Sequence, residues 1–189
     1  MAPVSQTVSA VAFAGTQRIA VGGLGDVAAA ARRALDELPE ATLLVFDRAS
    51  GRVIDLDLRG TAEEVAARYA SADPPPPRRG RPKLGVVARE VTLLPRHWDW
   101  LGLQPGGASV TLRRLVEAAS RSDAEAARAR TEAAYRFMST MAGDRIGFEE
   151  AARMLFAGDR AGLEARLAGW PGDVAEAVLR FLDGGHGEG

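Results

Sequence analysis

Few side chains in this sequence could perform acid–base, nucleophilic or metal chemistry. The 189 residues contain no cysteine, which excludes disulfides, thiolate metal sites and cysteine nucleophiles together. The histidines are His97 and His186, and a single histidine away from the chain end does not make a metal cluster. Asp55 and Asp57 alternate with apolar residues, which is typical of the solvated face of a strand. We therefore expect no enzyme activity, no catalytic residue, no bound metal and no cofactor.

Phosphate binding is the chemistry that the charge distribution favours. Between Pro74 and Arg121 there are 9 lysines and arginines against 3 aspartates and glutamates, although the whole chain has a net charge of −1. Such a local excess of cations attracts a nucleic-acid backbone. The excess begins with a short basic arm, whose cations are Arg78, Arg79, Arg81 and Lys83.

The basic arm also has the sequence of a groove-binding peptide. Residues 79–82, Arg-Gly-Arg-Pro, resemble the core of an AT-hook, which lies extended in a narrow A·T-rich minor groove. Prolines on either side keep the segment extended and lower the entropic cost of ordering it. The alternative interpretation is a solvated linker whose charges serve solubility.

The stretch after the arm, VTLLPRHWDWLGLQPGGASVTLRRLVEAAS, resembles the ribbon-helix-helix DNA-binding proteins in the order of its elements. We expect a strand over residues 91–94, a helix with Pro95 in its first turn, a turn at Gly106-Gly107 and a second helix capped by Ser109. In that family two chains pair their strands antiparallel and insert the resulting ribbon into the major groove. The resemblance therefore implies a homodimer that binds double-stranded DNA.

The same resemblance implies particular contacts. On the ribbon side the best candidates for DNA binding are Arg89, Thr92 and Arg96. Backbone N–H groups at the start of the second helix, those of Ser109 and Val110, would hold a phosphate. The strand parity stays open, because the row facing the groove is either Glu90, Thr92 and Leu94 or Arg89, Val91 and Leu93.

A second resemblance covers nearly the whole chain. The segments RGRPKLGVVAREVTLLPRHWDWL and AYRFM…FEEA…LFAGD are similar to those of an uncharacterised bacterial family, domain of unknown function 2239. This second resemblance implies no particular activity. From the basic segment we expect a transcriptional regulator that binds DNA as a dimer. The alternative is a protein-interaction module that uses the same segment only for dimerisation.

Dinucleotide binding is a further candidate function. The run from Gly23 through Gly25 to Ala28 satisfies G-x-G-x-x-A between a predicted strand and a predicted helix. Asp47 ends the next predicted strand, near the position of a ribose-binding acid. A hairpin rather than a helical crossover follows that strand, however, and the domain is too short for the usual two-halved sheet. A glycine-rich turn before a helix is the interpretation that we prefer.

The pattern of elements predicts an α+β protein of four parts. Residues 1–72 are expected to form a small ββαββα domain, residues 73–85 a proline-rich basic linker and arm, residues 86–121 the ribbon-helix-helix-like segment, and residues 122–189 a helical domain. The outer domains are expected to sense a ligand or to recruit a protein partner. Candidate helix caps are Asp26, Asp159, Asp173 and the pair Thr61 and Glu64.

The sequence shows no segment that addresses the chain to a membrane. Its apolar runs are too short to span a bilayer. The first ten residues, MAPVSQTVSA, lack the charged and apolar regions of a signal peptide. We therefore expect a cytoplasmic protein without a membrane partner.

Overall fold

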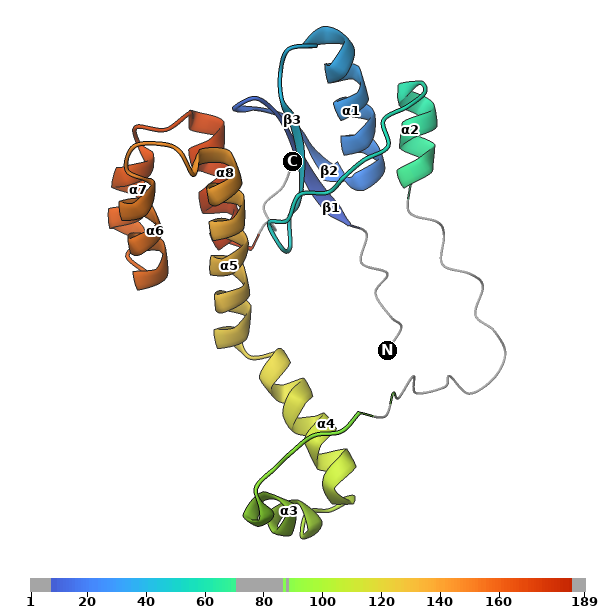
Figure 1. The fold of residues 1–189 in the computed structure, drawn as a ribbon, viewed down its shortest axis with the longest axis vertical. Coiled ribbons are helices and arrows are strands. Elements are labelled where there is room, and N and C mark those ends of the chain that lie inside the picture. The colour runs from blue at the N-terminus through green and yellow to red at the C-terminus, as the bar shows by residue number, and fades with distance from the viewer. Residues whose placement is uncertain (1–7, 71–86, 88, 185–189) are drawn as a thin grey trace. The chain divides into compact units, whose positions relative to one another are not determined.

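The computed structural model describes residues 8–70, 87 and 89–184, and it confirms the α+β class (Figure 1). The chain divides into two compact units. Unit 1 comprises residues 1–73 together with residues 127–189, and unit 2 comprises residues 74–126. Among the described residues, no helix is both long enough and apolar enough to cross a membrane. The described residues before residue 71 and those after residue 126 thus belong to the same compact unit.

A small antiparallel sheet lies in unit 1. Its strands are β1 (Ser9–Ala14), β2 (Gln17–Gly23) and β3 (Leu43–Asp47), in the order β2-β1-β3. β1 and β2 form the hairpin with which the expected ββαββα order begins, and its turn contains Gly15, whose φ of +57° suits a glycine. Along β1, Ala10 and Ala12 belong to one core cluster, whereas Val11 and Phe13 belong to another. Because both faces of β1 are apolar, helices must cover the sheet on both sides.

One helix covers the first face, and a second packs on that helix. α1 (Leu24–Glu37) packs against the sheet, and α2 (Ala62–Tyr69) packs against α1 (Figure 1). The capping box of α2 is confirmed, since Glu64 N–H donates to Thr61 Oγ1 at 3.3 Å and Thr61 N–H donates to Glu64 Oε2 at 2.9 Å. The expected cap of α1 is wrong, because Gly23 is the N-cap. Asp26 lies in the first turn instead, where its negative charge still opposes the positive end of the helix dipole.

The fourth strand that we expected over residues 52–58 does not form. Val53 makes one isolated bridge to Phe46, with backbone hydrogen bonds from the Asp47 N–H to the Arg52 carbonyl and from the Ile54 N–H to the Val45 carbonyl, and residues 55–58 form no strand. The alternation of the segment is nevertheless as expected. Its apolar side chains pack against the core cluster around α1, and they are Ile54, Leu56 and Leu58.

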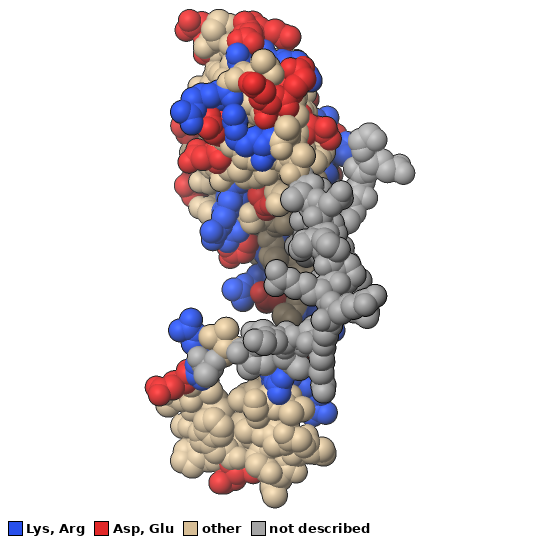
Figure 2. All heavy atoms as spheres, turned by 90° about the vertical axis from the view of Figure 1, so that its right-hand side faces the viewer, with Lys and Arg blue, Asp and Glu red and all other residues tan. Residues whose placement is uncertain are grey.

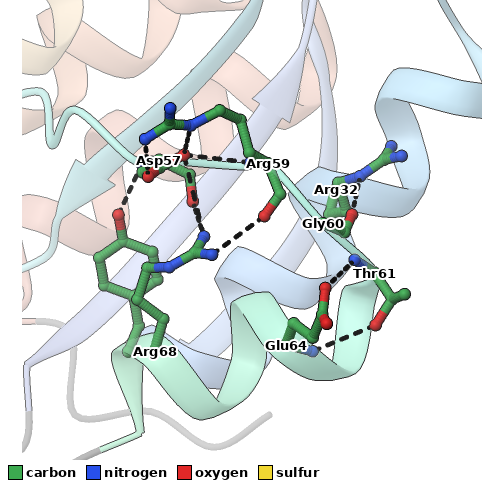
Figure 3. Close-up of polar contacts among 8 residues, drawn as sticks. Arg32, Asp57, Arg59, Gly60, Thr61, Glu64 and Arg68 are labelled. Carbon is green, nitrogen blue, oxygen red and sulfur yellow. Dashed lines mark hydrogen bonds and ion pairs between the residues drawn. The ribbon is translucent and has the colours of Figure 1, made fainter.

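After Ile54 the segment is hydrogen-bonded to α2 and not to the sheet (Figure 3). The backbone N–H of Asp57 donates to the Tyr69 hydroxyl at 2.6 Å. Arg68 donates to the carbonyl of Asp57 at 2.5 Å and to the carbonyl of Arg59 at 3.1 Å. Side chains of α2 therefore satisfy backbone groups that a β-ladder would have used, and this competition explains why the observed order is ββαβα.

Four helices follow in the C-terminal part of the chain. They are α5 (Asp123–Ala142), α6 (Phe148–Ala157), α7 (Arg160–Leu167) and α8 (Gly172–Leu182). The Phe137 ring of α5 lies 5.4 Å from Phe13, 4.9 Å from Phe46 and 5.0 Å from Phe181, measured between ring centroids. We expected residues 1–72 and 122–189 to fold separately. Instead they share one hydrophobic core, because the second face of the sheet is apolar and these helices bury it.

Of the two remaining cap predictions, one is confirmed and the other is wrong. Asp159 caps α7, and its side chain accepts the Gly162 N–H at 2.9 Å. Asp173 does not cap α8, whose N-cap is Pro171. The Asp173 carboxylate accepts the backbone N–H of Arg18 at 2.8 Å and so ties α8 to β2.

Candidate nucleic-acid interface

Unit 2 contains two helices joined by a short turn. α3 (Pro95–Gly102) begins at Pro95, as expected. α4 (Gly107–Ser120) begins earlier than expected, because its N-cap is Gly106 and not Ser109. Gly106 and Gly107 have φ values of +85° and +72°, a left-handed conformation that side chains other than glycine rarely adopt. These two glycines allow the chain to reverse between the helices.

The segment expected to form the ribbon precedes α3. Residues 91–94 form no strand within the described chain, and Leu94 is extended, with φ −67° and ψ 150°. Leu93 lines a groove between the two helices, and Thr92 is exposed. One of the two open parities places both Val91 and Leu93 inside, but Val91 is 55% exposed, so the strand parity stays open. A ribbon requires a partner strand from a second chain, so strand pairing stays a prediction.

The groove between α3 and α4 is apolar. It has a volume of about 270 Å³ and is lined by Leu93, His97, Trp100, Leu101, Leu112 and Leu115. Among the described residues of unit 2, just Leu101 and Thr111 are buried. The Thr111 hydroxyl has no hydrogen-bond partner in the described structure. Internal packing therefore contributes little to the stability of this unit.

Most apolar side chains of unit 2 are exposed. Leu103 is 84% exposed and Val116 is 64% exposed. Figure 2 shows the surface of this unit as broad and largely uncharged on the face in view. The other exposed apolar residues here are Val87, Val91, Leu94, Trp98, Trp100, Val110 and Leu115. A surface of this kind is typical of a protein–protein interface.

The structure describes three of the predicted DNA-binding side chains and does not describe the four of the basic arm. Arg89, Thr92 and Arg96 lie close together in the sequence and all are exposed beside the start of α3. The four cations of the arm lie outside the described residues, and they are Arg78, Arg79, Arg81 and Lys83.

The predicted phosphate-binding N–H groups shift with the start of α4. Ser109 lies in the first turn, where backbone N–H groups have no acceptor within the helix. Val110 is four residues after Gly106, so its N–H is the first that an α-helix bonds internally. The backbone N–H of Ala108, which was not predicted from the sequence, lies in the first turn in place of the N–H of Val110. Arg113 was also missed, and its Nε donates to the Ser109 carbonyl at 3.1 Å. Arg113 follows Ser109 by four residues, so the two lie on the same face of a helix. This spacing could have identified Arg113 from the sequence.

The geometry around Gly23 and Gly25 does not favour a dinucleotide site. The sheet is antiparallel throughout, so it lacks the parallel switch point at which such cofactors bind. A Cβ on Gly25 would lie 3.0 Å from the Ala66 carbonyl oxygen and 3.3 Å from the Ala70 backbone. Gly25 is therefore explained by the close packing of α2 against the start of α1.

The fold and this candidate site define an α+β protein whose chain also includes a two-helix unit with exposed apolar faces. The chain belongs to a family described as uncharacterized proteins conserved in bacteria (DUF2239), whose sequence model matches residues 9–182. The match spans both units, so unit 2 is part of the family sequence. No curated protein and no solved structure matches the chain.

Proposed function

We propose that this protein binds double-stranded DNA as a homodimer and acts as a transcriptional regulator. The observation that supports this proposal best is the pairing of two properties in unit 2. The segment concentrates the positive charge of an otherwise balanced chain, and its two helices leave their apolar faces exposed. The charge suits a phosphate backbone, and the apolar faces suit a second copy of the same unit.

In the proposed complex the apolar faces of α3 and α4 meet those of the partner. Residues 91–94 of the two chains pair as an antiparallel ribbon that enters the major groove. Thr92 then faces the groove from the ribbon, Arg89 and Arg96 contact the DNA from either side of it, and N–H groups of the first turn of α4 hold a phosphate. The basic arm neutralises further phosphates or enters the minor groove.

Salt dependence tests the electrostatic part of the proposal. If each of the four arm cations neutralises one phosphate, the affinity for a duplex falls on the order of 100-fold between 50 and 200 mM salt. Reversing two of them, in the variant Arg79→Glu with Arg81→Glu, should weaken binding and make this salt dependence shallower. The measurement is fluorescence anisotropy of a labelled duplex at several salt concentrations. A matched control is Arg153→Glu with Arg166→Glu, which reverses two exposed arginines of unit 1.

The outcome of this titration is decisive for the arm. Equal affinity of the wild type and the arm variant at every salt concentration would contradict the role of the arm in DNA binding. A similar loss in the control variant would show that the effect depends on net charge and not on the arm.

The second candidate function is a protein-interaction module that dimerises through unit 2 without binding DNA. The exposed apolar side chains of α3 and α4 favour it as much as they favour the first. Val116→Glu should abolish the dimer in sedimentation experiments, whereas Phe156→Glu, at a similarly exposed position of α6, should leave it intact. A dimer that shows no affinity for duplex at low salt would select this second function.

A further inference from the structure

A second cavity lies among the C-terminal helices of unit 1. It has a volume of about 220 Å³, and its lining comes from α5, α6, α7, α8 and the short connection between α6 and α7. All its lining residues lie between residues 127 and 182, so it is formed within one compact unit. We call this cavity the α5–α8 pocket.

Four aliphatic side chains form the apolar part of the α5–α8 pocket. Leu155 and Leu163 are buried and belong to the larger core cluster of unit 1. Met154 and Leu182 are partly buried, pack against the same cluster and also line the pocket. A ligand that rests on these side chains must offer an apolar group, because burying a polar group without a partner is unfavourable.

The two arginines that line the pocket differ in their partners. Arg160 donates to Glu164 Oε1 at 2.9 Å and to the two carboxylate oxygens of Asp183 at 2.6 and 3.2 Å. These hydrogen bonds, first those to Asp183, raise the pKa of Arg160. Arg130 is half-buried and makes no hydrogen bond or ion pair with any residue that the structure describes. Arg130 can therefore pair with an anionic group of a ligand.

Asp159 adds a carboxylate to the same pocket. Its Oδ1 accepts the Gly162 N–H at 2.9 Å and so caps α7, whereas its Oδ2 accepts no hydrogen bond from the described part of the chain. A Cβ on Gly162 would overlap with Oδ2 and would lie 3.0 Å from Met154 Sδ, so this oxygen and the Met154 side chain lie on the same side of Gly162. Asp159 and Arg130 form no ion pair with each other, so each retains its charge for a ligand.

We propose that the α5–α8 pocket binds a free α-amino acid with an apolar side chain. Such a molecule carries a carboxylate that matches the guanidinium of Arg130 and an ammonium group that matches the carboxylate of Asp159. Its side chain then covers the four aliphatic residues of the pocket. This site belongs to unit 1, and it does not depend on the proposed DNA interface.

The charges and the size of the pocket both favour a zwitterion of this kind. An anion without an ammonium group would also meet the negative charges of Asp159 and of the two partners of Arg160, so it would gain less than a zwitterion. The volume of about 220 Å³ lies below the roughly 300–1,000 Å³ of sites for drug-sized ligands. A molecule of amino-acid size therefore suits this cavity.

Calorimetric titration of the full chain tests the proposal. We expect L-leucine or L-methionine at millimolar concentration to give saturable heat and to raise the melting temperature. L-Alanine should bind more weakly, because it offers less apolar surface. Leucinamide lacks the carboxylate and N-acetyl-leucine lacks the ammonium group, so each should bind about tenfold more weakly than L-leucine.

Single substitutions assign the binding to this pocket. Arg130→Gln should weaken L-leucine by about tenfold and remove its advantage over leucinamide, because the cation that meets the carboxylate is lost. Asp159→Asn should likewise remove the advantage over N-acetyl-leucine, and asparagine still caps α7 because it is as good an N-cap residue as aspartate. Arg166→Gln is the matched control, since Arg166 is an exposed arginine of α7 that does not line the pocket.

Several results would overturn the proposal. They are the lack of saturable heat with both L-leucine and L-methionine, binding of leucinamide as tight as that of L-leucine, undiminished binding in both Arg130→Gln and Asp159→Asn, and equal weakening in Arg166→Gln. Arg130→Lys keeps the charge and should retain part of the affinity, which guards against a glutamine variant that fails to fold. The melting temperature of each variant without ligand shows whether it is folded.

Discussion

Asp57 lies in the segment that was expected to form a fourth strand. Its carboxylate is paired with two arginine side chains. Arg59 donates to both carboxylate oxygens, with distances of 2.8 and 2.6 Å, and Arg68 Nη1 lies 3.9 Å away (Figure 3). From the sequence alone, an acid alternating with leucines indicates a solvated face. In the structure the same residue also anchors residues 54–60 to α2. Asp57 thus contributes contacts that hold this segment in place.

The pH dependence of folding should reveal this anchor. The pKa of Asp57 is lowered, first by the side-chain hydrogen bond from Arg59, then by the Arg59 backbone N–H, and last by the charges of Arg59 and Arg68. A lowered pKa means that the contribution to stability is complete above about pH 4 and is lost as the pH falls through the folded-state pKa. Asp57→Asn should therefore melt slightly below the wild type at pH 7, and the difference should shrink as the pH falls below about 4. Melting curves across this range measure it.

Asp55→Asn is the control, because Asp55 is exposed on the same segment. The anchor would be contradicted by a melting difference between Asp57→Asn and the wild type that stays constant or grows toward low pH.

At the scale of elements, the turn after β3 makes close contact with α5. Ser50 donates its N–H and its hydroxyl to Asp47 Oδ1, each at 2.6 Å. Arg136 of α5 donates to the Ser50 carbonyl at 2.9 Å. Gly51 has a φ of +68°, and a Cβ placed there would lie 2.0 Å from the Ala133 carbonyl oxygen. The backbones of turn and helix approach so closely that a side chain does not fit between them.

Gly51→Ala should destabilise unit 1 by about 2–5 kcal/mol, because it adds a steric overlap to an unfavourable backbone conformation. Gly15→Ala separates the two causes. Gly15 has a similar φ of +57° but open space around its Cβ position, so it should cost about 1–2 kcal/mol. Urea unfolding of both variants gives the two free energies. Equal costs at the two positions would show that the turn and α5 do not meet as closely as described.

At the scale of the whole molecule, unit 1 is formed by both ends of the chain. Its larger core cluster joins Val11, Phe13 and Phe46 of the sheet to the buried faces of α5, α6, α7 and α8. Unit 2 lies between these ends in the sequence and has little buried surface of its own. The cooperative folding unit is therefore discontinuous in sequence.

Fragments of the chain test this organisation. Residues 1–73 alone should not unfold cooperatively, because one face of their sheet loses the helices that bury it. Co-expression with residues 127–189 should restore a folded complex that copurifies and melts in one transition. The readout is circular dichroism of the fragment and of the pair. A fragment 1–73 that melts cooperatively by itself would support the separate N-terminal domain that the sequence had suggested.

Sequence alone determined what depends on neighbouring residues. The α+β class, the β1–β2 hairpin, the capping box at Thr61 and Glu64, and the cap at Asp159 all follow from patterns a few residues long. The apolar alternation of residues 54–58 was likewise predictable, although its pairing was not. For the candidate DNA interface, the positive charge between Pro74 and Arg121 and the start of α3 at Pro95 could also be predicted from neighbouring residues.

The tertiary structure decided what depends on residues far apart in the chain. It merged the outer parts into one core, because Phe137 meets Phe13 and Phe46. It removed the fourth strand, because Arg68 and Tyr69 compete for the backbone of residues 57–59. It also brought Arg18 of β2, Arg48 after β3 and Arg180 of α8 around one pocket. Each outcome is set by packing between distant segments, and local sequence patterns carry no information about which distant segments will meet.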